Sequence, residues 1–330
     1  MSAPTTWVVC DDKQGITNQC VGIAEAVGVA PIVKYSRPRL LWRYLPAAWW
    51  PMPLAAQRAD ADPLRPPWPQ LLITAGRSAF APAVEIKRRS QGRTVLVAIQ
   101  NPRMDLKKFD LVIVPAHDRL SGPNVLVTDG APHRVTPARL AAEAPAARAR
   151  LGGLPAPIVT VLIGGSNSAY RLDAAIAADL GARLAAFARD HGVSLALTPS
   201  RRTPPDVVQA FRTALAGANA FIWDGGGENP YFGFLGLADA VIVTADSVSM
   251  ITEAAVTQKP VYVLPLPGPG GKFSAFQDHM TRRGITRPFT GAYERWTYAP
   301  LDDMARAAAA IGRLLSERGG VPHTLVASPI

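Results

Sequence analysis

Polar residues that could bind a phosphate and a ribose follow an apolar run in the stretch VIVTADSVSMITEAAVTQKPVYVLPLP, residues 241–267. The spacing of Asp246, Ser249 and Glu253 brings their side chains to one face of a predicted helix. Asp246 or Ser247 can cap that helix, and amide groups at a helix start favour phosphate. Glu253, one turn further on, could accept hydrogen bonds from two ribose hydroxyls. A cap alone does not require Glu253 on this face, so the pattern favours ligand binding.

Four other segments of the second half place similar chemistry at predicted strand ends. Glycines before a helix let the backbone approach a phosphate, paired arginines can clamp a diphosphate, and an aromatic ring can hold a nucleobase. A tight turn, a solvated loop or a flexible glycine turn would each explain one segment alone. These segments lack the G-x-G-x-x-G dinucleotide fingerprint. Their candidate donor-binding residues are Gly164, Gly165, Ser166, Asn167, Ser200, Arg201, Arg202, Trp223, Lys272 and Gln277.

The elements that must position these residues follow the same pattern in both halves of the chain. Short apolar runs alternate with helical patterns, which is typical of a parallel sheet covered on both faces. The sequence therefore predicts an α/β protein with two Rossmann-like domains facing across a cleft, with ligands outside the carboxyl ends of the strands. The predicted strands are 6–10, 31–36, 70–76, 94–100, 111–116, 124–130, 158–163, 194–200, 220–226, 240–245 and 261–266.

A helical stretch that runs into glycine and proline, residues 135–157, indicates a boundary near 150–156. The predicted domains are therefore an acceptor domain at 1–152 and a donor domain at 153–300. A terminal helix and its tail follow at 301–330.

Composition and charge narrow the class of protein. The 330 residues, 48% of them hydrophobic, suffice for two cores. The first residues do not read as a signal peptide, and no run approaches about 18 apolar residues, so no transmembrane helix is predicted. Cys10 and Cys20 have no metal or disulfide spacing, which predicts buried free thiols in a reducing, cytoplasmic compartment. Residues 1–155 carry +9 of the net charge of +10, and such a field attracts phosphate-rich partners.

Residues 37–69 hold four of the seven tryptophans, with arginines beside them and prolines between them. Tryptophan and arginine beside leucine and methionine suit peripheral docking at an anionic membrane surface, such as the inner membrane. The alternative is a loop whose tryptophans pack into a core or against another subunit. Nucleic-acid binding is not expected, because the arginines are not interleaved with a stacking platform. The four tryptophans are Trp42, Trp49, Trp50 and Trp68.

The second half resembles the donor half of glycosyltransferases with the B-type two-domain fold. The matching segments are VLIGGSNSA, TPSRR, TADSVSMITEAAVTQKPVYVLPLP and KFSAFQ, in that order. The lipid-linked peptidoglycan N-acetylglucosaminyltransferase is the comparison that fits best. This resemblance implies a UDP-sugar donor, diphosphate contacts from Ser166 and the amides of 247–249, ribose contact from Glu253 and sugar contact from Gln277. It also implies that the terminal helix crosses back onto the first domain.

Most of residues 8–300 also resemble the family named after the plant mitochondrial fission factor, which has many bacterial members. The pieces that carry this resemblance include DDKQGITNQCVGIAEAVG, TAGRSAFAPAVEIKR, QNPRMDLKKFDLVIVPAHDRL, TDGAPHRV, WDGGGENPY and ITRPF. Its bacterial members are described either as glycosyltransferases or as nucleotide-sugar epimerases.

The resemblance to B-type transferases implies that the first half holds the acceptor and supplies a general base from its first strand–helix loop. The base must reach an acceptor hydroxyl and stay ionised at neutral pH. Asp12 is the candidate, and N-capping of the helix is its alternative. His117, Asp118 and His133 lie in later loops, where a histidine is either the base or exposed polar surface. The acceptor-side candidates are Gln14, Asn18, Gln19, Arg77, Ser78 and His117.

The sequence offers no convincing metal site. Asp60 and Asp62 resemble the carboxylate pair of A-type glycosyltransferases, but they lie in a proline-rich loop and not at a strand end. No His/Cys cluster suggests zinc, and no P-loop is present. We therefore expect a metal-independent, cofactor-free glycosyltransferase that acts on a membrane-associated or cell-envelope acceptor. The alternatives are a nucleotide-sugar epimerase on the same fold and a non-catalytic scaffold with a vestigial nucleotide site.

Overall fold

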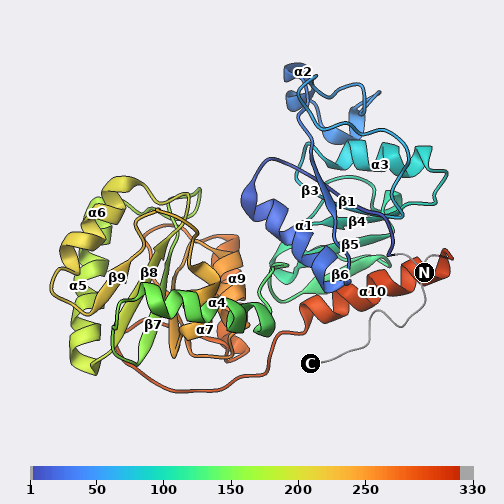
Figure 1. Ribbon diagram of the computed structural model, residues 1–330. Coiled ribbons are helices and arrows are strands. Elements are labelled where there is room, and N and C mark those ends of the chain that lie inside the picture. Colours follow the sequence, from blue (N-terminus) through green and yellow to red (C-terminus); the bar gives the residue numbers. More distant parts are fainter. Residues whose placement is uncertain (1–2, 320–330) are drawn as a thin grey trace. The chain divides into compact units, whose positions relative to one another are not determined.

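The computed structural model describes residues 3–319 and divides into two compact units. Unit 1 contains the residues up to Arg134 and those from Asp302 onward, and unit 2 contains Val135–Leu301. Each unit is built on a six-stranded parallel sheet with helices on both faces (Figure 1). The prediction of an α/β protein with two parallel sheets is therefore confirmed.

The sheet of unit 1 has the strand order β2-β1-β3-β4-β5-β6. The apolar runs of the first half form its strands, which are β1 (Thr6–Cys10), β2 (Ile32–Tyr35), β3 (Leu71–Ala75), β4 (Val95–Ile99), β5 (Leu111–Pro115) and β6 (Val125–Thr128). The helical elements of this unit are α1 (Gln14–Ala26), α2 (Leu40–Tyr44), α3 (Phe80–Arg89), α10 (Asp303–Glu317) and the 3₁₀ turns η1 (Ala47–Trp49), η2 (Leu106–Lys108) and η3 (Ala116–Asp118).

Alternate residues of each central strand face opposite helical layers. In β1, Val8 and Cys10 pack in the cluster formed with α1 and α10, whereas Trp7 and Val9 pack in the cluster formed with α3. Figure 1 shows α1 and α10 on one side of this sheet and α3 on the other. Burial on both faces explains why these strands are apolar runs without polar alternation. Cys10 and Cys20 are both buried and free, as predicted.

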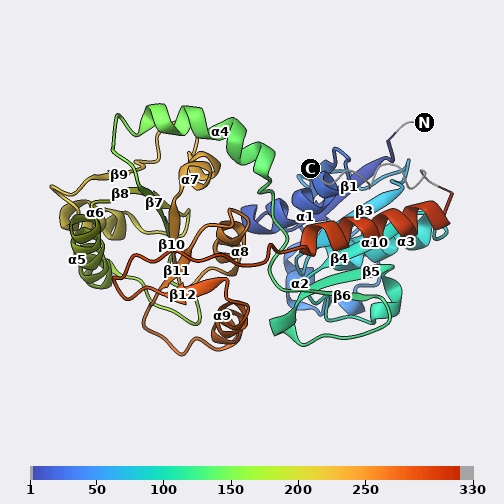
Figure 2. The same cartoon turned by 90° about the horizontal axis from the view of Figure 1, so that it is seen from below.

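The terminal helix α10 is tied to unit 1 at both of its ends (Figure 2). The Asp303 carboxylate accepts the backbone N–H groups of Asp129 and Gly130 at 3.0 and 2.9 Å. Burial raises the pKa of Asp303, against these hydrogen bonds, which lower it. At the other end Arg318 donates to the carbonyl groups of Gly92 and Thr94.

Unit 2 repeats this architecture with the strand order β12-β11-β10-β7-β8-β9. Its strands are β7 (Ile158–Ile163), β8 (Ser194–Pro199), β9 (Ala220–Ile222), β10 (Ala240–Thr244), β11 (Val261–Leu264) and β12 (Thr286–Pro288). Its helices are α4 (Pro137–Arg150), α5 (Ala174–His191), α6 (Pro205–Ala214), α7 (Tyr231–Leu237), α8 (Val248–Ala255) and α9 (Lys272–Arg282). The short strand β12 and helix α7 were not predicted, because neither has a clear apolar period.

Unit 2 begins at Val135, before α4, whereas the sequence suggested a boundary near 150–156. The reason is the close packing of α4 on α7. A Cβ at Gly233 would lie 2.5 Å from the Ala147 Cβ, and one at Gly236 would lie 2.4 Å from the Leu140 carbonyl oxygen. The two glycines thus let the helices touch through their backbones, and α4 belongs with the second sheet.

A glycine on α1 gives a stability prediction for unit 1. A Cβ at Gly22 would lie 2.1 Å from the carbonyl oxygen of His133, which is backbone and cannot swing away. We expect Gly22→Ala to lower the free energy of unfolding by about 2 kcal/mol. Gly15→Ala on the same helix is the matched control, since nothing lies within 4 Å of its Cβ, and it should be neutral or slightly stabilising. Urea unfolding of both variants tests this, and equal midpoints would contradict it.

Candidate functional site

The chain order of the strands reverses at one point in each sheet, and in unit 2 this point lies between β7 and β10. Ligands of open parallel sheets bind outside the carboxyl ends of the strands at such a switch point. The loop after β7 carries Gly164–Asn167, and the loop after β10 carries Asp246 and Ser247. The topology therefore brings together two of the segments predicted to bind the donor.

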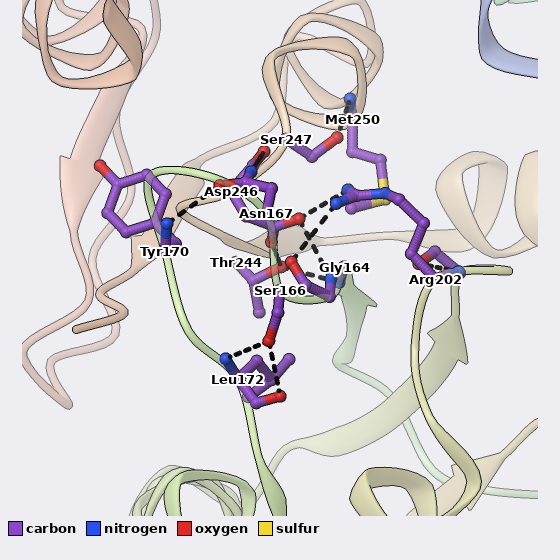
Figure 3. A network of polar contacts seen from close by, with 12 residues as sticks. Gly164, Ser166, Asn167, Tyr170, Leu172, Arg202, Thr244, Asp246, Ser247 and Met250 are labelled. Carbon is purple, nitrogen blue, oxygen red and sulfur yellow. Dashed lines mark hydrogen bonds and ion pairs between the residues drawn. The ribbon is translucent and has the colours of Figure 1, made fainter. Parts of the chain in front are cut away.

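Asp246 locks these two loops to each other (Figure 3). Its side chain has no exposed surface, and its carboxylate accepts the Gly165 N–H at 3.1 Å and the Thr244 hydroxyl at 2.6 Å. The Thr244 hydroxyl in turn accepts the Gly164 N–H at 2.8 Å. Arg202, from the loop after β8, forms an ion pair of 2.6 Å with Asp246 and leaves 46% of its own side chain exposed.

The expectation that Asp246, Ser249 and Glu253 share one ligand-facing helix surface is wrong for Asp246. Helix α8 begins at Val248, so Asp246 precedes it and turns toward the glycine loop. Ser247 is the N-cap, and its Oγ accepts the Met250 N–H at 3.3 Å. Asp246 therefore positions the backbone of the site and cannot contact a ligand from its buried place.

Gly164 and Gly165 are required by packing. A Cβ at Gly164 would lie 2.2 Å from both carboxylate oxygens of Asp246, and a Cβ at Gly165 would lie 2.4 Å from the Arg202 carbonyl oxygen. The sequence predicts that these glycines let the backbone approach a phosphate. Glycine is needed at both positions because any side chain there would prevent the loops after β7, β8 and β10 from packing together.

Three other candidate donor residues also hold the loops in place. The Ser166 hydroxyl donates to the Leu172 carbonyl and accepts the Leu172 N–H. Asn167 accepts the N–H groups of Ala169 and Tyr170 and donates to the Asp246 carbonyl at 3.1 Å. Gln277 on α9 donates to the Ala245 carbonyl at 2.7 Å and to the Tyr170 hydroxyl at 3.2 Å. Their side-chain groups are thus already engaged within the protein.

Glu253 lies on α8 and is partly buried, and it accepts a hydrogen bond from the hydroxyl of Tyr231 on α7. Burial raises the pKa of Glu253 to about 7, although the Tyr231 hydrogen bond lowers it. Burial and the neighbouring carboxylate also raise the pKa of Tyr231 well above its usual value, so its phenol stays protonated and donates. The site therefore contains a carboxyl group that changes charge near neutral pH.

The remaining donor-side candidates lie in other loops of unit 2. Ser200 organises the loop after β8, where its N–H donates to the Thr203 hydroxyl at 2.9 Å. Arg201 and Lys272 are exposed. The indole of Trp223 donates to the Gly226 carbonyl at 3.0 Å, which places Trp223 in the glycine turn after β9.

The switch point of unit 1 lies between β1 and β3 and coincides with a pocket of about 460 Å³. The loop after β1 supplies Asp12 and Lys13, and the loop after β3 supplies Arg77 and Ser78. Asp11 joins the two loops, because its carboxylate accepts the Ser78 N–H at 3.1 Å and also the Ser78 hydroxyl.

The candidate base Asp12 is 63% exposed in this pocket and forms an ion pair of 3.0 Å with Arg37. Gln14 donates to Asn18 one helical turn later, and the buried Gln19 accepts a hydrogen bond from Gln100. These contacts leave Asp12 as the acceptor-side candidate that faces the pocket from the first strand–helix loop.

His133 is buried and the side chain of His117 is largely covered, so neither histidine is the exposed polar surface that was the alternative for them. The His117 ring lies 3.9 Å from the Asp118 carboxylate and has only 7% of its side chain exposed. Neither histidine lines the pocket at the switch point of unit 1.

Sequence reasoning missed several residues that build these sites. Thr244 and Tyr170 hold the donor loops, Tyr231 bonds to Glu253, and Arg37 and Arg58 line the pocket of unit 1. Thr244 lies within residues 241–267, so its hydroxyl is a local signal in the sequence. Tyr170 follows Asn167 by three residues and is also local. Tyr231, Arg37 and Arg58 come from other segments, and only the fold brings them to these sites.

Two general properties bear on the site. Within residues 3–319, no group of three or more His, Cys, Asp and Glu side chains is placed to hold a metal ion. The helices of this part of the chain are all too short or too polar to cross a bilayer.

Solved structures with a similar fold include two UDP-GlcNAc 2-epimerases. The enzyme of Neisseria meningitidis, bound to UDP-GlcNAc, has a TM-score of 0.51 and 12% identity, and the match covers 95% of this chain and all of that one. The enzyme of Methanocaldococcus jannaschii has a TM-score of 0.50 and 9% identity, covering 92% of this chain and 91% of the other. At such identities the likeness shows the fold alone, which is the predicted two-domain glycosyltransferase B type. The cleft between the domains stays a prediction.

Sequence relatives identify the family. The mitochondrial fission protein ELM1 of Arabidopsis thaliana is 36% identical over an alignment of 278 residues that covers 76% of this chain. This chain spans 65% of the length of the plant protein. An uncharacterized protein of Rickettsia prowazekii (strain Madrid E) is 25% identical over 92% of this chain and 96% of its own length. The family profile described as Mitochondrial fission ELM1 matches residues 14–315. The chain therefore belongs to the mitochondrial fission ELM1 family.

Proposed function

We propose that this protein is a metal-independent glycosyltransferase that binds a nucleotide-diphosphate sugar, a UDP sugar, on unit 2. The observation that carries the proposal is the locked arrangement at the switch point of that unit. Buried Asp246 fixes the glycine loop after β7 against the start of α8, and Arg202 beside them keeps nearly half of its side chain exposed. A helix start with an adjacent arginine favours a diphosphate.

We assign the ribose to Glu253 and the diphosphate to the first turn of α8 and Arg202, because the Gly164 and Gly165 N–H groups already donate to Thr244 and Asp246. Most candidate polar side chains of these loops are bonded within the protein, so backbone amides and the two charged groups carry the recognition. The UDP-GlcNAc held by the Neisseria epimerase on the same fold supports a ligand of this class. No metal is required, because the helix start and the arginine offset the phosphate charge.

For transfer, we propose Asp12 of unit 1 as the general base. An exposed carboxylate paired with Arg37 can take the proton of an acceptor hydroxyl, which then attacks the anomeric carbon while the nucleoside diphosphate leaves. The acceptor we propose is membrane-associated or part of the cell envelope, and the protein itself is cytoplasmic and peripheral to the membrane.

Calorimetric titration tests the donor site directly. The purified chain should bind UDP in the presence of EDTA, and more tightly than GDP, CDP or ADP. UDP-GlcNAc should bind as well, without net conversion in the absence of an acceptor. If no nucleotide binds, the glycosyltransferase and the epimerase are both excluded, and a non-catalytic scaffold is the alternative that is left.

An epimerase is the second candidate, favoured by the two epimerase structures with the same fold. It would need acid and base groups on both faces of the sugar. Proton NMR of UDP-GlcNAc incubated with the protein distinguishes the two reactions. Inversion at C2, or sugar release without an acceptor, would select the epimerase over the transferase.

A further inference from the structure

Unit 1 exposes a group of large apolar side chains on one short segment. Among the described residues, seven large apolar side chains are classed as exposed, and five of them lie between residues 40 and 52. We call these five the apolar rim. With their exposed fractions they are Leu40 (66%), Tyr44 (78%), Leu45 (40%), Trp49 (73%) and Met52 (64%).

The rim stands on a packed base. Trp50 is only 6% exposed, its ring lies 5.9 Å from that of Trp42, and its indole donates to the Leu45 carbonyl at 3.2 Å. Trp50 also packs with Ala56 and with Ala81 of α3. Figure 1 shows α2 and the loops around it projecting beyond the sheet of unit 1. The sequence left open whether the tryptophans of this segment pack inside or face a membrane. Trp50 is packed inside, whereas Trp49 faces solvent.

The cationic pocket at the switch point of unit 1 adjoins this rim. Lys13, Arg37, Arg58 and Arg77 line it together with Trp50, and Asp11 and Asp12 are the acidic residues of the lining. Arg77 joins the two features, since its guanidinium donates to the Tyr44 and Leu45 carbonyls at 3.5 and 3.3 Å.

The cations of the pocket are held by exchangeable contacts. Arg37 pairs with Asp12 at 3.0 Å, and Arg58 pairs with Asp60 at 2.9 Å, with at least 40% of every one of these side chains exposed. Exposed ion pairs contribute little stability, so a phosphate can take over the guanidinium groups at small cost. The pocket is also large enough for a phosphorylated headgroup.

We propose that unit 1 docks on a bilayer that carries anionic phospholipid. The pocket receives a headgroup phosphate, while the apolar rim enters the membrane interface. Trp and Tyr beside Leu and Met are the side chains that favour this depth, and the surrounding charge is complementary. Unit 1 holds 20 Lys and Arg against 13 Asp and Glu, a formal charge of +7. The inference deepens the proposed function, because it makes the bilayer the place where the acceptor is met, but docking itself requires no nucleotide.

Vesicle co-sedimentation of the full chain without nucleotide tests this. Binding to phosphatidylcholine vesicles with about a third phosphatidylglycerol should exceed binding to pure phosphatidylcholine at least tenfold, and should weaken with added salt. The double variant Leu45→Ser/Trp49→Ser should lose at least tenfold in affinity, and Lys13→Gln/Arg77→Gln should lose the preference for the anionic lipid. Ile32→Ser and Arg103→Gln are the matched controls, since Ile32 is 54% exposed outside the rim and Arg103 does not line the pocket.

The outcomes separate docking from the donor site. All four variants should keep the wild-type circular dichroism and the wild-type UDP affinity, because they lie in unit 1. Equal binding to the two kinds of vesicle, or unchanged binding of the Leu45/Trp49 variant, would overturn the proposal. Binding of inorganic phosphate as tight as that of the vesicles would also overturn it, since the ligand would then be a free anion. If the wild-type protein binds vesicles but not UDP, the proposed function is wrong and the docking proposal still stands.

Discussion

Replacing Asp246 with alanine should lower the free energy of unfolding of unit 2 by about 3 kcal/mol and abolish measurable nucleotide binding. The side chain has no exposed surface, and its carboxylate is the acceptor for Gly165, Thr244 and Arg202. Without it a buried N–H and a buried hydroxyl lose their partner, and water cannot replace the carboxylate without disturbing the loops. The backbone amides that we assign to the diphosphate would then lose their geometry.

Two further variants show whether the effect belongs to this network. Asp224→Ala removes an exposed carboxylate of the same unit that accepts one N–H, from Gly226 at 2.8 Å, and should change stability by less than about 1 kcal/mol. Asp246→Asn keeps the shape of the side chain but removes the charge that Arg202 pairs with. Its loss of stability should lie between those of Asp224→Ala and Asp246→Ala. Urea unfolding and UDP calorimetry give the two readouts. A stable Asp246→Ala variant that binds UDP like wild type would show that the loops do not depend on the carboxylate.

The sequence predicts the fold of this protein well because the strands are buried on both faces. Runs such as Leu71–Ala75 and Ala240–Thr244 contain almost only apolar residues, which a solvent-exposed strand would not. By contrast, β12 covers only Thr286–Pro288 and carries two exposed residues, so its sequence resembles a loop. The start of unit 2 also could not be predicted from the sequence, because it depends on which of the two sheets α4 packs against.

The sequence predicts which loops of unit 2 lie together, but not what each side chain in them contacts. Polar residues after apolar runs indicate the carboxyl end of a sheet, and the loops at Gly164 and Asp246 do follow the neighbouring strands β7 and β10. Whether Asp246 faces a ligand or the protein depends on Gly165, which is 81 residues away, and such a pairing has no local pattern. The pair of Glu253 and Tyr231 was missed for the same reason, since α7 and α8 meet only in the folded unit.

UDP affinity should rise about tenfold between pH 6 and pH 8, and Glu253→Gln should remove this dependence. Burial raises the pKa of Glu253 to about 7, so the ionised form that accepts ribose hydroxyl bonds is a minor species at pH 6 and the major one at pH 8. Apparent affinity scales with the fraction of protein in the binding-competent form. Calorimetry of UDP over this range measures the slope, and Glu228→Gln, which alters an exposed glutamate of the same unit, should keep it.

The same group predicts a stability change of opposite sign. Because the folded pKa of Glu253 is raised above its ordinary value of 4.5, its contribution to stability is full below pH 4.5 and is lost as pH rises through 7. Glu253→Gln should therefore be more stable than wild type at pH 8, on the order of 3 kcal/mol, and no more stable at pH 4.5.

Tyr231→Phe completes the test, because it removes the hydrogen bond that lowers the pKa of Glu253. The midpoint of the pH dependence of UDP affinity should then move above 7. An affinity that is flat with pH in wild type, or a midpoint that Tyr231→Phe leaves unchanged, would exclude Glu253 as the ionised contact to the ribose. If the midpoint of UDP affinity lies near pH 7 in wild type and shifts in Tyr231→Phe, Glu253 is the titrating group. Loss of its proton would then strengthen donor binding and weaken the folding of unit 2.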